Sequence, residues 1–158
     1  MTARILILNG PSLNLLGVRE PHIYGTTTLA AIEASCRKLA GTIGVSLDFR
    51  QSNHEGVLVD WVQDALATAD GIIINPAACT FTSVALRDAL AMCQAPIVEL
   101  HISNIHARDE IHRHSLISPI AKAVICGLGA QGYPVALHCV AAMLGALPPD
   151  AAPPARGL

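Results

Sequence analysis

The chain has 158 residues, of which 52% are hydrophobic and 14% charged, and its formal net charge is -2. This length fits one domain with a sizeable core. The near-neutral charge, without runs of like charge, argues against a nucleic-acid binder, and no apolar stretch approaches the roughly 18 to 20 residues of a membrane span. Because the N-terminus also lacks a signal-peptide pattern, we expect a cytoplasmic protein whose partners are small molecules or copies of itself.

Five short apolar runs rich in β-branched residues predict β-strands. They cover residues 4–8, 45–49, 71–74, 96–100 and 123–126. Segments with helical spacing and suitable caps occupy 26–44, 55–71, 81–94 and 133–147, and we expect the third helix to start after Thr82 or Ser83. Strands that alternate with helices predict a parallel sheet covered on both faces. The simplest such architecture is a three-layer α/β fold, five-stranded and flavodoxin-like.

We expect residues 1–147 to form one domain of this kind. Residues 148–158 are rich in proline and alanine, which is typical of a disordered tail. The five cysteines are an odd number without a C-x-x-C pair, and this indicates thiols in a reducing compartment.

Polar side chains follow the predicted strands at the points where the strands end. Asn9 follows the first strand, Asn75 the third, and His101 and Ser103 the fourth. Ligands of open α/β sheets bind at the carboxyl ends of the strands, so we expect these residues to line a pocket for a polar, anionic small molecule.

The segment 9–25 contains three glycines and two prolines, which predicts a loop with defined turns over this edge of the sheet. The loop carries Arg19 and Tyr24. A guanidinium group beside a phenol favours the phenolate, and a phenolate is a competent base towards a carbon acid. In the alternative interpretation, Tyr24 is a packing aromatic and Arg19 is a solvated loop charge.

Glu99 and His101 are two residues apart on one predicted strand, so their side chains point to the same side of the sheet. A carboxylate beside an imidazole fixes its tautomer and favours the protonated form that a general acid needs. In the alternative interpretation, His101 is only a hydrogen-bonded residue at the strand end.

Three stretches of the sequence resemble, in order and in spacing, the type II 3-dehydroquinate dehydratases. They are NGPSLNLLGVREPHIYG at 9–25, INPAACTFTSVALRDAL at 74–90 and VELHISNIHARDEIHRHS at 98–115. The resemblance runs from Ile5 to about Leu144. It implies a hydro-lyase of the shikimate pathway that converts 3-dehydroquinate to 3-dehydroshikimate through an enolate, without a metal or an organic cofactor. It also implies a homododecamer built from trimers.

The resemblance assigns roles to individual residues. Tyr24 matches the base that removes a proton from C2, Arg19 the arginine that keeps this tyrosine ionised, and His101 the acid that protonates the departing C1 hydroxyl. Further active-site and substrate-binding groups are matched by Asn75, Ile102, Ser103, Glu99, Arg108 and Asp88, the last of which reaches the site of a neighbouring subunit.

Three residues depart from the family pattern: Ser12, Phe81 and His112 stand where the family usually has asparagine, histidine and arginine. In the family the first orders a water that stabilises the enolate, and the other two contact ring hydroxyls. A relative acting on a different cyclic hydroxy acid, or a non-catalytic binding member, therefore remains an alternative. A binding member would be expected to lose the base and the acid first, and both are kept, which favours an enzyme.

Two other motifs suggest different functions. GLGAQG at 127–132 formally matches G-x-G-x-x-G, but no strand ending in an acidic residue follows it, so we interpret its glycines as a turn with close helix packing. His106, His112 and His114 occur in a short span. On a helix the rings of His112 and His114 would point apart, so we expect a solvated or interface helix and no metal site.

Overall fold

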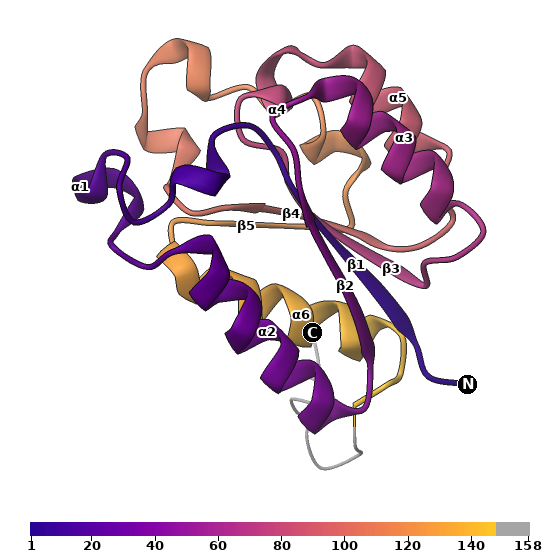
Figure 1. Cartoon of the computed structure of the whole chain (residues 1–158). Coiled ribbons are helices and arrows are strands. Elements are labelled where there is room, and N and C mark those ends of the chain that lie inside the picture. The colour runs from indigo at the N-terminus through magenta and orange to yellow at the C-terminus, as the bar shows by residue number, and fades with distance from the viewer. Residues whose placement is uncertain (148–158) are drawn as a thin grey trace, which may run out of the picture.

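The computed structural model describes residues 1–147, so the predicted tail at 148–158 lies outside the described residues. Its centre is a sheet of five parallel strands in the order β2-β1-β3-β4-β5 (Figure 1). The strands are β1 (Arg4–Asn9), β2 (Ser46–Gln51), β3 (Gly71–Asn75), β4 (Ile97–His101) and β5 (Ala123–Cys126). This order confirms the predicted flavodoxin-like α/β fold.

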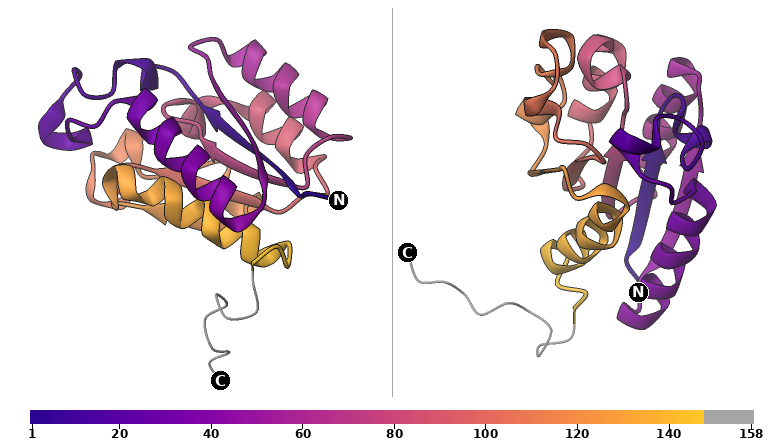
Figure 2. Two further views of the ribbon diagram at one scale, coloured as in Figure 1. Left: turned by 60° about the horizontal axis from the view of Figure 1, so that its bottom comes forward. Right: turned by 90° about the vertical axis from the view of Figure 1, so that its left-hand side faces the viewer.

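Helices cover both faces of the sheet and make the fold three-layered. On one face lie α2 (Leu29–Ile43) and α6 (Gly132–Met143), and on the other lie α3 (Glu55–Ala65) and α5 (Val84–Ala91), as Figures 1 and 2 show. Two shorter helices, α1 (Pro21–Tyr24) and α4 (Cys79–Thr82), lie near the carboxyl ends of the strands. No helix within 1–147 has the length and apolar character needed to cross a membrane.

The core is divided into two parts by the sheet. Successive strand residues point to opposite faces, so Ile5 and Ile7 pack under α2 and α6 while Leu6 and Leu8 pack under α3 and α5. The central strands β1, β3 and β4 are covered on both faces, and this explains why nearly all of their residues are buried and most are apolar.

One predicted helix start is confirmed: α5 begins directly after Ser83, whose side chain caps it by accepting a hydrogen bond from the Leu86 N–H. The structure corrects two other predicted elements. The second strand continues to Gln51, beyond the predicted residue 49. The segment with His106, His112 and His114 forms short 3-10 turns, at Ile105–Ala107 and Glu110–His112, and no α-helix.

The carboxyl ends of β1, β3 and β4 meet at one edge of the sheet, beneath the loop 9–25. Gly10 allows this loop to leave β1 directly over the chain that follows β3, since a Cβ atom there would lie only 2.3 Å from the Pro76 carbonyl oxygen. Met1 and the end of α6 lie at the opposite edge of the sheet (Figures 1 and 2).

Candidate active site

A cavity of about 230 Å³ opens at the carboxyl ends of β3 and β4, beneath the loop 9–25. Ten of the predicted site residues line it: Ser12, Arg19, Tyr24, Asn75, Phe81, His101, Ile102, Ser103, Arg108 and His112. Residues from three distant stretches of the sequence therefore meet in one place. Of the strand-end residues expected at this pocket, Asn75, His101 and Ser103 line the cavity, whereas Asn9 does not, because its side chain is fully buried against Tyr133 and the Arg50 carbonyl.

Two further predicted site residues, Glu99 and Asp88, also lie outside the cavity. Glu99 is fully buried on β4 and contacts the cavity only through His101. Asp88 lies on α5, is exposed, and forms an ion pair with the neighbouring Arg87. Within this chain Asp88 is therefore outside the cavity.

Tyr24 is half-buried and lies at the end of α1, between two arginines. The guanidinium carbon of Arg19 and that of Arg108 each lie 5.9 Å from the centroid of the Tyr24 ring. Arg19 also forms an ion pair with Glu20, with 3.2 Å between Nε and the carboxylate oxygen. The phenol of Tyr24 therefore lies beside two cationic groups of the cavity wall, which can attract negative charge on a ligand.

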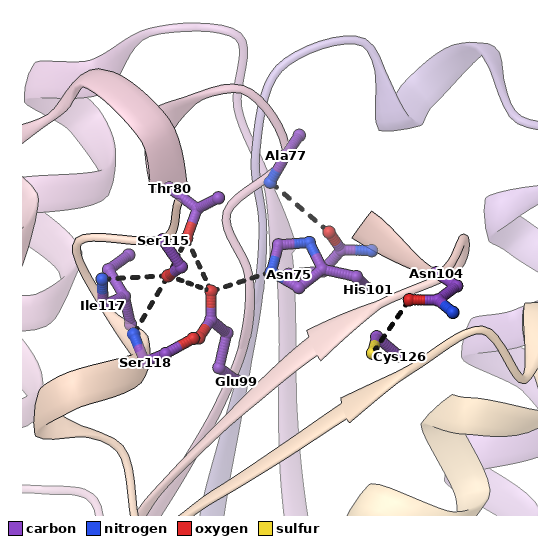
Figure 3. A network of polar contacts seen from close by, with 10 residues as sticks. All are labelled: Asn75, Ala77, Thr80, Glu99, His101, Asn104, Ser115, Ile117, Ser118 and Cys126. Atoms are coloured by element: carbon purple, nitrogen blue, oxygen red, sulfur yellow. Dashed lines mark hydrogen bonds and ion pairs between the residues drawn. The ribbon is translucent and has the colours of Figure 1, made fainter. Parts of the chain in front are cut away.

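A dense hydrogen-bond network holds the Glu99 carboxylate (Figure 3). Its Oε1 atom lies 2.7 Å from Nε2 of His101, 2.5 Å from the Thr80 hydroxyl and 2.6 Å from the Ser115 hydroxyl, and its Oε2 atom accepts from Ser118. Burial alone would raise the pKa of Glu99. The hydrogen bonds from His101, Ser115, Ser118 and Thr80 outweigh burial and lower it from 4.5 to about 2.

The ionised carboxylate sets the orientation of the histidine ring. Because a carboxylate only accepts hydrogen bonds, the Nε2 atom of His101 carries a proton and donates it to Glu99. The other ring nitrogen, Nδ1, is left for a ligand. His101 is only 4% exposed, so the cavity is its route to a ligand.

Phe81 forms an apolar section of the cavity wall between two imidazoles. Its ring is stacked with that of His101 at a centroid distance of 6.3 Å, and it meets the ring of His112 edge-on at 5.3 Å. The Nδ1 atom of His112 lies 2.5 Å from Oδ1 of Asp109, and this hydrogen bond lowers the pKa of the Asp109 carboxyl. This side of the cavity is therefore less polar than the side with Tyr24.

Comparison with known proteins assigns the chain to a family. A family model described as dehydroquinase class II matches residues 3–141. The chain belongs to the class II dehydroquinase family. The resemblance seen in the sequence is thereby confirmed, and with it the assignment to a family of hydro-lyases.

Relatives of known identity agree with this assignment. The 3-dehydroquinate dehydratase of Rhizobium meliloti (strain 1021) is 56% identical over 140 residues, which cover 89% of this chain and 95% of that protein. The protein of the same name from Brucella canis is 53% identical over 143 residues, which cover 90% and 91%.

Solved structures show the same fold. The type II dehydroquinase from Propionibacterium acnes superposes with a TM-score of 0.86 at 41% identity, covering 90% of this chain and 98% of that one. A 3-dehydroquinate dehydratase-like protein from Bifidobacterium longum has a TM-score of 0.69 at 32% identity, with coverage of 90% and 98%.

In this dehydroquinase, backbone strain is concentrated at the cavity. Ser12 and Ala77 both line it and have positive φ angles, 67° and 51°, which residues with a Cβ atom rarely adopt. Hydrogen bonds hold both positions: the Ser12 N–H donates to Asn53 Oδ1 at 2.8 Å, and the Ala77 N–H donates to Asn75 Oδ1 at 3.3 Å. The cavity wall is thus held in a defined shape.

Sequence reasoning missed several groups of the site. The hydroxyls around Glu99 come from Thr80, Ser115 and Ser118, and Asn75 donates a hydrogen bond to the buried Tyr133 hydroxyl at 2.9 Å. Thr80 and Ser115 fall inside the motifs that carry the resemblance, so their position was a usable signal. Tyr133 gave no comparable signal.

The two alternative motifs, the histidine-rich span and GLGAQG, do not have the surroundings of a cofactor site within residues 1–147. Across residues 1–147 no three His, Cys, Asp or Glu side chains are grouped as metal ligands. His114 instead pairs with Glu110 on the exposed surface. Gly127 and Gly129 have positive φ angles in the turn before α6, and no strand follows α6 within the described residues.

Proposed function

We propose that this chain is a 3-dehydroquinate dehydratase that removes water from 3-dehydroquinate to give 3-dehydroshikimate. Tyr24, as the phenolate, removes a proton from C2 and leaves an enolate. His101 then protonates the C1 hydroxyl as the C–O bond breaks, so that water departs and the new double bond forms. Over one turnover the substrate loses one proton to Tyr24 and gains one proton from His101, so the net loss is one molecule of water.

One observation carries this proposal: a single cavity contains a tyrosine between two arginines and a histidine backed by a buried carboxylate. The positive charge of Arg19 and Arg108 supports a phenolate at Tyr24. The negative charge of Glu99 supports a protonated imidazole at His101. A base and an acid are thus supported in the opposite charge states that an elimination requires.

The remaining polar groups suit the carboxylate of the substrate. Three of these groups line the cavity near His101. Ile102 and Ser103 follow His101 in the sequence, and Asn75 ends the neighbouring strand β3. In our proposal they bind that carboxylate, which directs the C1 hydroxyl of the ring towards His101. The 3% exposure of Asn75 means that its hydrogen bonds to a ligand would be shielded from water.

A second candidate substrate is a cyclic acid with fewer hydroxyls. Phe81 supports it, because its apolar ring occupies the cavity wall between His101 and His112 and has no group to pair with a substrate hydroxyl. A hydroxyl buried there without a partner weakens binding. The base and the acid keep their roles in this alternative.

The proposal further includes an assembly and a location. In a homododecamer built from trimers, Asp88 of one subunit would reach the cavity of the next, which is consistent with its exposure on α5 outside its own cavity. We also propose that the enzyme is cytoplasmic.

The test is a spectrophotometric assay of purified protein with 3-dehydroquinate, following the absorbance of the conjugated enone product. We expect turnover that the His101→Ala variant lacks. If the protein converts only a less hydroxylated ring acid, the second candidate replaces the first. If it binds 3-dehydroshikimate but converts neither compound, it is a non-catalytic binding member and the proposal is wrong.

A further inference from the structure

A chain of buried hydrogen bonds connects the helix α6 to the cavity wall. Asn9 and Asn75 are register partners at the ends of the neighbouring strands β1 and β3, so their side chains point to the same face of the sheet. Tyr133, the second residue of α6, lies on that face and contacts both. All three are at most 3% exposed.

The hydrogen bonds that link Asn9, Tyr133 and Asn75 allow only one assignment of donors and acceptors. Asn9 donates through Nδ2 to the Arg50 carbonyl oxygen at 3.0 Å, so its Oδ1 atom is the group that faces Tyr133. The Tyr133 hydroxyl donates its single proton to that Oδ1 atom at 2.7 Å. Its oxygen can then only accept, and it accepts from Nδ2 of Asn75 at 2.9 Å.

This arrangement determines which way the Asn75 carboxamide points. If the amide turned over, its oxygen would face the Tyr133 oxygen, whose proton is already used, and its nitrogen would face the Ala77 N–H. Both contacts would be unfavourable in a buried site. The observed orientation leaves the second Nδ2 proton of Asn75 without a hydrogen-bond partner among residues 1–147, on a side chain that lines the cavity.

We propose that Tyr133 is a positioning residue, whose hydroxyl holds Asn75 as a hydrogen-bond donor towards an oxygen of the bound substrate. Tyr133 does not line the cavity and acts only through Asn75. Burial raises the pKa of the Tyr133 phenol, so it keeps the proton that the chain of hydrogen bonds requires. The identity of the substrate rests on the function proposed above, while the orientation of Asn75 does not.

The first test is a double-mutant cycle on purified protein with 3-dehydroquinate. We expect Tyr133→Phe to lower kcat/KM about tenfold, the size of one hydrogen bond to substrate, mainly through KM. We expect Asn75→Ala to lower kcat/KM further, and the double variant to be no worse than Asn75→Ala alone. Effects that multiply in the double variant, or a Tyr133→Phe variant with wild-type kinetics, would overturn the proposal.

Phe49→Leu is the matched control for packing. The Phe49 ring lies against the Tyr133 ring, with 6.3 Å between centroids. Its side chain takes no part in the hydrogen bonds that link Asn9, Tyr133 and Asn75. We expect it to reduce thermal stability while kcat/KM stays within about twofold of wild type. If Phe49→Leu lowers kcat/KM as much as Tyr133→Phe does, Tyr133 acts through packing and the proposal is wrong.

A second variant keeps the proposal testable if the Tyr133→Phe protein does not fold. Asn9→Ala frees the Tyr133 proton, which can then turn to Asn75 and permit the other amide orientation. We expect a several-fold rise in KM, again absent in the Asn75→Ala background. A KM equal to that of wild type would contradict the proposed role.

A readout without substrate separates this proposal from the proposed function. In an atomic-resolution crystal structure of Tyr133→Phe or Asn9→Ala, we expect the Asn75 amide in two orientations, against one in wild type. Failure of wild type to convert 3-dehydroquinate would remove the proposed function and leave this result intact. A single, unchanged amide orientation in both variants would overturn the positioning role.

Discussion

Nε2 of His101 lies 2.7 Å from Oε1 of Glu99, and neither side chain is more than 5% exposed. The two residues are adjacent on one face of β4, so the strand itself delivers the acid and its carboxylate together. Three hydroxyls complete the surroundings of Glu99 and anchor the segment that precedes β5. The protonation state of Glu99 therefore affects both the hydrogen bond to His101 and the stability of the fold.

The first prediction concerns stability against pH. The pKa of Glu99 is about 2 in the native protein, below its ordinary 4.5, so ionised Glu99 stabilises the fold fully above pH 4.5 and loses this effect as pH falls towards 2. The size is on the order of 3 kcal/mol. Urea unfolding should therefore show Glu99→Gln well below wild type at pH 7, with a smaller difference near pH 3.

The control for this prediction is Glu110→Gln. Glu110 also pairs with a histidine, His114, but both side chains are exposed, so we expect a change of less than about 1 kcal/mol at either pH. A Glu99→Gln deficit that is equal at both pH values would show that the loss is steric and not ionic.

The second prediction concerns the proposed base. Tyr24→Phe keeps the ring between Arg19 and Arg108 but removes the oxygen that takes the proton. We expect kcat to fall by roughly two to four orders of magnitude while the Kd of 3-dehydroshikimate changes little. Val18→Ala, an exposed change on the same loop, should leave kcat unchanged. Near wild-type turnover by Tyr24→Phe would eliminate this mechanism.

The third prediction concerns the apolar section of the cavity. Phe81→His together with His112→Arg introduces hydrogen-bond donors there and should raise kcat/KM for 3-dehydroquinate at least about tenfold, a gain that needs only about 1.4 kcal/mol. The two rings are in contact at 5.3 Å, so the single variants should not add. If the double variant is less active than wild type, the enzyme is already adapted to 3-dehydroquinate with these residues.

The fourth prediction concerns assembly. Val84 and Met92, at the two ends of the helix that carries Asp88, are 58% and 52% exposed, which suits a face covered by another subunit. Light scattering at micromolar concentration should give the mass of a dodecamer. A monomer would rule out the shared site.

Mixing two impaired variants tests the shared site directly. Tyr24→Phe keeps Asp88, and Asp88→Asn keeps Tyr24, so a mixed oligomer would contain some cavities with both groups. We expect activity to recover after the two proteins are dissociated and reassembled together. No recovery, with intact oligomers, would mean that Asp88 does not serve a neighbouring cavity.

Much of the fold was predictable from the sequence because the buried strands are short and apolar and the polar residues follow them directly. Asn75 and His101 could be placed at the cavity on that basis alone. The start of α5 was also predictable, because serine and threonine favour the N-cap position, and the helix begins directly after Ser83.

The supporting groups of the site were not predictable in the same way. Tyr133 contacts residues 58 and 124 positions away in the chain, and one tyrosine in an apolar helix reads as a core residue. Serines are common in any sequence, and Ser118 lies outside the motifs that carry the resemblance, so its role is evident only from its hydrogen bond to Glu99. Such contacts arise from tertiary packing.

Because β1 runs from the N-terminus towards the loop 9–25 and α6 runs away from that loop, both the N-terminus and the end of α6 lie at the end of the sheet remote from this loop (Figure 2). A sensor surface or a fused reporter attached at the N-terminal amino group would therefore leave the entrance of the cavity unobstructed. Immobilised protein should accept ligand as readily as free protein does, which makes biosensor measurement of the variants practicable without relocating the point of attachment.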